Sequence, residues 1–79
     1  MNTKESILNL IASSINVEVT TLSCQDVLEN IPGWSSIAYV MVIAEIESLF
    51  GIKLSGDDLF DVETIDDLIT LVNKMIEQK

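Results

Sequence analysis

Two adjacent serines, Ser35 and Ser36, carry the hydroxyl groups of this chain that are the best candidates for a chemical modification. They follow the turn residues Pro32 and Gly33 and open a segment whose apolar residues have helical spacing. A serine at a helix start can accept a hydrogen bond from a free backbone N–H, which stabilises the helix by about 1 kcal/mol. One serine is enough for that role. Because a helix N-terminus also favours phosphate, the second hydroxyl is a candidate site for a phosphate-linked modification.

Catalytic groups of other kinds are missing from the sequence. It contains no histidine, which excludes Ser-His and Cys-His pairs and imidazole-bound metals. Cys24 is the only cysteine and has no basic neighbour in the sequence to activate it, so an incidental or buried thiol is favoured over a nucleophile. The acidic segment 57–67 lacks the residue order of a calcium loop, and its adjacent acids diverge by about 100° on a helix. We therefore predict a protein that is not an enzyme and has no metal site.

Apolar residues at helical spacing predict a first and a last helix. The first begins at Asn2 or Thr3, with Glu5 placed to complete a capping box from Asn2. Its apolar face consists of Ile7, Leu8, Leu10, Ile11 and Ile15. The last begins at Thr64, with Asp67 in the capping-box position. Its apolar face consists of Ile65, Leu68, Ile69, Val72, Met75 and Ile76.

The helix that carries the serines is predicted to run from about Ser36 to Phe50, with Gly51 as its left-handed stop. Its core side is predicted to consist of Tyr39, Val42, Ile43, Ile46, Leu49 and Phe50. Its outward side is predicted to consist of Ile37, Met41, Ala44, Glu45 and Ser48, with Glu47 at the margin. Since an outward face is normally polar, this partly apolar strip beside the serines is a candidate docking surface.

The remaining segments complete a small helical domain. Residues 16–34 predict a long loop laid against the core, and loops of this length are usually functional. Ser55 and Asp58 have capping-box spacing for a short helix, GDDLF, before the last one. No segment alternates with period two. The predicted fold class is all-α, a four-helix bundle of three longer helices and one short one, in a single domain over residues 1–79.

The charge of the chain restricts its partners. The chain has thirteen acidic residues and four lysines, which gives a formal net charge of −9. Nucleic acid and anionic membranes are therefore excluded as partners, and basic docking surfaces are favoured, although acidic residues also serve solubility alone. The sequence has neither a signal peptide nor the roughly 20 apolar residues of a membrane span. We expect a cytoplasmic monomer.

The segment PGWSSIAYVMVIAEIESLFGIKL, residues 32–54, resembles the centre of acyl carrier proteins. In that family an Asp-Ser-Leu motif opens the second helix and a Phe-Gly-Ile stop ends it. Ser36 stands at the position of the modified serine, Ile37 at the leucine, and residues 50–52 at the stop. The segment TIDDLITLV, residues 64–72, is similar to the family's last helix. The resemblance covers essentially the whole chain and implies an acyl-carrier-like bundle.

What the resemblance implies is a freestanding carrier protein. A phosphopantetheinyl transferase would attach 4′-phosphopantetheine from coenzyme A to Ser36, while Ser35 caps the helix beside the site. The terminal thiol would hold an acyl or aminoacyl group as a thioester for biosynthetic enzymes with basic docking surfaces. These enzymes would recognise the outward face defined above. Trp34 favours a specialised pathway, such as polyketide, peptide or polysaccharide-linked synthesis, over fatty acid biosynthesis.

Two departures from the family pattern keep alternatives open. Ser35 replaces the usual aspartate, and Met41 replaces a frequent glutamate. Serine caps a helix about as well as aspartate, so we predict altered transferase or partner preference and not loss of function. The alternatives are an unmodified interaction module with the carrier fold, an aminoacyl or peptidyl carrier, and a thiol enzyme that uses Cys24.

Overall fold

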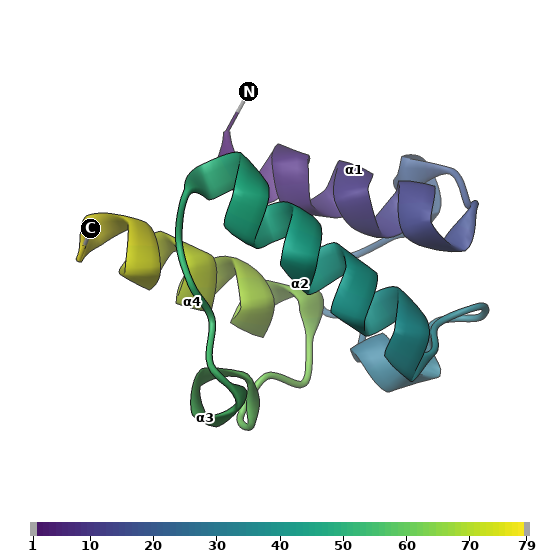
Figure 1. The fold of residues 1–79 in the computed structure, drawn as a ribbon. Helices are drawn as coiled ribbons and strands as arrows, with labels where there is room; N and C mark the ends of the chain where they lie inside the picture. Colours follow the sequence, from purple (N-terminus) through teal and green to yellow (C-terminus); the bar gives the residue numbers. More distant parts are fainter. Residues whose placement is uncertain (1, 79) are drawn as a thin grey trace.

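The computed structural model describes residues 2–78, and Figure 1 shows how its helices are arranged. In order they are α1 (Thr3–Ile15), η1 (Val19–Thr21), η2 (Leu28–Asn30), α2 (Ser36–Phe50), α3 (Gly56–Leu59) and α4 (Ile65–Glu77), where η marks a single 3₁₀ turn. No β-strand occurs among the residues described. The predicted all-α fold of three longer helices and one short one is confirmed.

All four helices described begin with a side-chain cap. The capping boxes predicted at Ser55 and Thr64 are both present with their two reciprocal bonds. At α1 the side chain of Asn2 accepts a hydrogen bond from the Glu5 N–H at 2.8 Å, while the return bond of a box is not formed among residues 2–78. Gly51 ends α2 in the left-handed conformation, with φ of 65°, as predicted. These local bonds fix where each helix begins and, at Gly51, where α2 ends.

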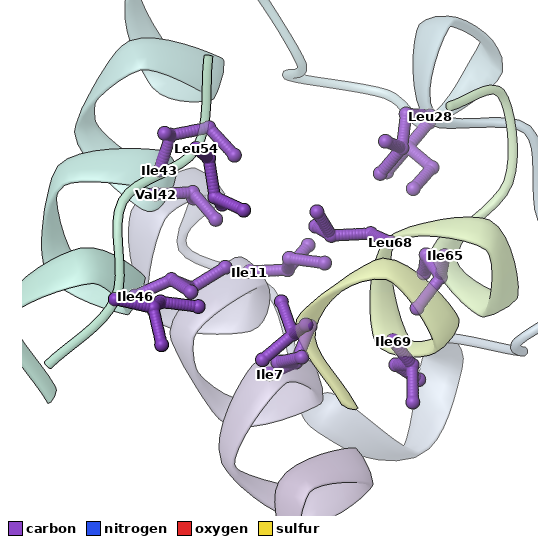
Figure 2. Close-up of a cluster of buried hydrophobic side chains, with 13 residues drawn as sticks. Ile7, Ile11, Leu28, Val42, Ile43, Ile46, Leu54, Ile65, Leu68 and Ile69 are labelled. Carbon is purple, nitrogen blue, oxygen red and sulfur yellow. The ribbon is translucent and has the colours of Figure 1, made fainter. Parts of the chain in front are cut away.

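The core lies between α1, α2 and α4, with α1 in contact with both of the other two helices. In Figure 2 the side chains of Ile7 and Ile11 from α1 extend toward Leu68 of α4 and the apolar face of α2. The single turn of α3 lies in the connection between α2 and α4, away from α1 (Figure 1). The most deeply buried side chains are Ile7, Ile11, Val42, Ile46, Ile65, Leu68 and Val72.

One residue of the predicted core side of α2 is exposed. Leu49 keeps 59% of its surface accessible, whereas Val42, Ile43 and Ile46 are buried as predicted. Leu49 lies close to Val42 in helical position, at the edge of the buried face, whereas Phe50 in the same last turn packs against the core. The helical pattern gives the direction of a side chain, but it does not give how far the buried face extends around the helix.

The long first loop is attached to the start of α4. The Leu28 N–H donates to the Glu63 carbonyl at 2.9 Å, and the Ile65 N–H donates to the Asp26 carbonyl at 3.1 Å. An isolated antiparallel bridge pairs Val27 with Thr64 in the same region. Leu28 is buried in the core. The loop thus lies against the core, as predicted, and its second turn faces the chain just before α4.

Candidate functional site

The two serines have different surroundings at the start of α2. Ser35 is the N-cap, with extended backbone, and its Oγ accepts a hydrogen bond from the Ala38 N–H at 3.1 Å. Ser36 is the first helical residue and is exposed. Among the residues that the structure describes, its hydroxyl has no hydrogen-bond partner. One hydroxyl therefore stabilises the helix, while the other has no partner among the described residues.

The turn before the serines has a fixed conformation. Gly33 adopts φ of +88°, which residues with a side chain rarely adopt. The Trp34 N–H donates to the Ile31 carbonyl at 3.0 Å, and the Ile31 side chain is buried. The turn is therefore held against the core by Ile31, and Ser35 and Ser36, which follow it, lie at the surface.

A groove of about 590 Å³ lies beside the serines. Three segments distant in sequence form its walls, namely the loop around η2, the first turn of α2 and the chain just before α4. The rings of Trp34 and Tyr39 lie within it, with centroids 5.7 Å apart and planes inclined by 58°. Burial raises the pKa of the Tyr39 hydroxyl, so this group stays protonated at neutral pH. The lining consists of Val27, Leu28, Glu29, Trp34, Ser35, Ser36, Tyr39, Val62 and Glu63.

The predicted outward face of α2 is accessible. Ile37 is 72% exposed and Met41 53% exposed, and Ala44, Glu45 and Ser48 are exposed as well. Val40, 66% exposed, extends the apolar strip and was missed by the sequence reasoning, although its helical position adjoins those of Ile37 and Ala44.

Glu47, placed at the margin of that face, has a role within the fold. It is half-buried, and its Oε2 accepts a hydrogen bond from the Leu54 N–H at 2.8 Å. This bond holds the chain that leaves α2 against the helix. Nothing in the sequence between Glu47 and Leu54 indicates such a contact, because it depends on the path of the chain after Gly51.

The remaining candidate residues are Cys24 and the acidic side chains of α3 and α4. Cys24 is a free, half-buried thiol packed against the core. Within residues 2–78 no group of three or more Cys, Asp or Glu side chains is arranged to hold a metal ion. Hydrogen bonds from Ser55 hold the pKa of Asp58 below its usual value, and those from Thr64 and Glu63 do the same for Asp67. No described helix combines the length and apolar character that crossing a bilayer requires.

Comparison with known proteins identifies the family. The family model described as "Phosphopantetheine attachment site" matches residues 5–72. The solution structure of a holo acyl carrier protein from Geobacter metallireducens is similar, with a TM-score of 0.84 and 20% identity over 99% of this chain and 90% of that one. No curated protein sequence matches. The fold is thus that of an acyl carrier protein, and the chain belongs to the phosphopantetheine-attachment family, as predicted: it is a carrier protein, not an enzyme, and takes covalently bound 4′-phosphopantetheine.

Proposed function

We propose that Ser36 is the attachment site and that residues 1–79 form a single carrier domain. The observation that carries this proposal is the difference between the two hydroxyls, since Ser35 Oγ caps α2 and Ser36 Oγ is exposed without a partner among the described residues. In the transfer, Ser36 Oγ bonds to the phosphorus of the phosphopantetheine half of coenzyme A. The phosphoanhydride bond to the nucleotide half breaks, and the Ser36 proton is released.

The residues around Ser36 suit a phosphodiester. Ser36 and Ile37 are the first residues of α2, and the N–H groups of a first helical turn have no acceptor within the helix. These groups and the positive end of the helix dipole stabilise a negative charge. When bound, the cofactor supplies a thiol that carries an acyl or aminoacyl group as a thioester. The chain itself positions this group and leaves acid–base chemistry to its partners.

We further propose that the exposed face of α2 is the docking surface for the transferase and for the enzymes that use the cargo. Its centre is apolar, with Ile37, Val40 and Met41, and Glu45 contributes negative charge beside them. Partners should therefore combine a small apolar contact with a basic rim. Ser35 in place of aspartate removes one negative charge next to the modified residue, so transferases that rely on that charge should react more slowly.

Intact-mass measurement tests the attachment site. The chain is incubated with coenzyme A and a promiscuous phosphopantetheinyl transferase, and fragmentation locates the adduct. We expect one phosphopantetheine on Ser36 and none on Ser36→Ala. An adduct on Ser35 would move the site by one residue. No adduct with several transferases would overturn the proposal and favour an unmodified interaction module.

A further inference from the structure

We propose that the groove beside Ser36 receives an arginine side chain of the transferase that modifies this serine. The guanidinium group lies against the rings of Trp34 and Tyr39 and pairs with the carboxylates of Glu29 and Glu63. The inference rests on the proposed function, because the transferase must act at Ser36. It adds a second point of contact to the exposed face of α2 and gives the chemistry of the partner group that fits there.

The position of the groove gives the first argument. Ser36 is one of its lining residues, so a protein surface that reaches the Ser36 hydroxyl also covers the groove. Successive residues of a helix turn by about 100°, which places Tyr39 about 60° to one side of Ser36 and Val40 about 40° to the other. Tyr39 lines the groove, whereas Val40 belongs to the exposed face of α2. Ser36 therefore lies between these two surfaces, and one partner can contact both.

The charge of the groove gives the second argument. Its charged lining residues are Glu29 of η2 and Glu63 before α4, both exposed, and no lysine among the described residues lines it. Within residues 2–78 neither carboxylate takes part in an ion pair or a hydrogen bond. The first turn of α2 carries no acidic residue, so the negative charge of the groove comes from these two carboxylates alone. A cation that pairs with them must come from a partner.

An arginine fits this lining better than a lysine. Trp34 and Tyr39 are half-buried, and their ring centroids lie 5.7 Å apart with the planes inclined by 58°. The planar guanidinium group is less strongly hydrated than an ammonium group, stacks on aromatic rings and donates two parallel hydrogen bonds to a carboxylate. Tryptophan attracts cations more strongly than the other aromatic side chains do. The groove of about 590 Å³ offers rings and carboxylates together.

The reaction at Ser36 gives the third argument. Coenzyme A is an anion, and its phosphorus must approach the Ser36 Oγ next to a groove that carries two negative charges. Repulsion between these charges and the phosphates opposes the approach. A guanidinium group bound in the groove offsets this repulsion, while the transfer itself proceeds as described above. The acidic groove therefore recruits the enzyme and hinders free coenzyme A.

Kinetics of the transfer test the need for the two carboxylates. The transferase is one that intact-mass measurement shows to modify Ser36, and the groove variant is Glu29→Gln/Glu63→Gln. The matched control, Glu18→Gln/Glu77→Gln, removes the same charge from exposed residues outside the groove. We expect the KM for the groove variant to rise about tenfold with kcat nearly unchanged, since two partly exposed ion pairs are lost. The control should stay within about twofold of the wild type.

A double-mutant cycle tests for the arginine. Each arginine around the active site of the transferase is replaced by alanine and assayed with the wild-type chain and with the groove variant. One such substitution should raise the KM for the wild-type chain about tenfold and have little effect with the groove variant, because both changes remove the same contact. Trp34→Leu should also raise the KM, whereas Phe60→Leu, at an 87% exposed position outside the groove, should not. If Trp34→Leu does not fold, the cycle with the exposed glutamates decides the question.

The outcomes distinguish this inference from the proposed function. If no transferase modifies Ser36, both fail. If Ser36 is modified and the groove variant reacts as the control does, the effect of charge is not confined to the groove and only the inference fails. A cycle in which no arginine is coupled to the groove glutamates would overturn it as well. The same holds if the groove variant impairs only enzymes that act on the loaded arm, because the groove would then serve a later partner.

Discussion

Replacing each serine of the pair by alanine should separate the stability of α2 from its modification. Ser35→Ala removes the acceptor of the Ala38 N–H, a bond of 3.1 Å at an N-cap. Loss of such a cap costs about 1 kcal/mol, which corresponds to a decrease of about 4–8 °C in Tm for a domain of this size. Ser36→Ala removes an exposed hydroxyl without a partner among the described residues, so its free energy of unfolding should change by less than about 0.5 kcal/mol.

The assay combines urea unfolding of the apo proteins with intact-mass measurement of the same samples after treatment with the transferase. With a slope of about 1 kcal/mol per molar urea, Ser35→Ala should lower the unfolding midpoint by about 1 M. It should still accept the arm. Ser36→Ala should keep the wild-type midpoint and accept none. Ser35→Asp restores an oxygen acceptor at the cap and should recover the stability.

Two results would refute this reasoning. If Ser36→Ala destabilised the fold as much as Ser35→Ala, the second hydroxyl would also have a structural role. If Ser35→Ala prevented modification while Ser36→Ala retained it, the assignment of the two roles would be reversed. A Ser35→Asp variant as unstable as Ser35→Ala would show that the hydroxyl of Ser35 acts in some way other than as a cap.

Three further predictions concern stability. Glu47→Ala should lower the free energy of unfolding by about 1 kcal/mol through loss of its bond to the chain after α2, whereas the exposed Glu45→Ala should not. Because hydrogen bonds lower the pKa of Asp67 in the folded state, its contribution is present above the unfolded pKa of about 3.9 and is lost as the pH falls through the folded value. Asp67→Ala should therefore be less stable than its exposed neighbour variant Asp66→Ala at pH 7, and the difference in thermal unfolding should vanish in strong acid. Leu68→Ala, at a fully buried position, should cost about 2–5 kcal/mol in chemical unfolding; a smaller loss would mean that the core collapses around the cavity.

Features that depend on neighbours in sequence could be predicted from the sequence. The caps at Ser55 and Thr64 each join residues three apart, and Gly51 ends its helix through its own backbone freedom. The helix start beside the two serines could also be placed, whereas the choice of Ser36 over Ser35 rests on the family resemblance and stays a prediction. The helical pattern likewise gave the buried face of α2 up to Ile46.

Features that depend on the path of the chain could not be predicted in this way. The bond from Glu47 to Leu54 requires the turn after α2 to fold back on the helix. The exposure of Leu49, next to the partly buried Phe50, depends on which tertiary neighbours cover each side of α2. The groove is a further example, because its walls come from three segments that no local pattern connects.

The second turn of the first loop, η2, forms part of the wall of this groove. Leu28 and Glu29 of η2 line the groove together with the serines, and backbone hydrogen bonds hold η2 to the chain before α4. The same bonds hold Glu63 at the groove, so the loop and the start of α4 form one wall. The surroundings of Ser36 therefore depend on contacts distant from it in sequence.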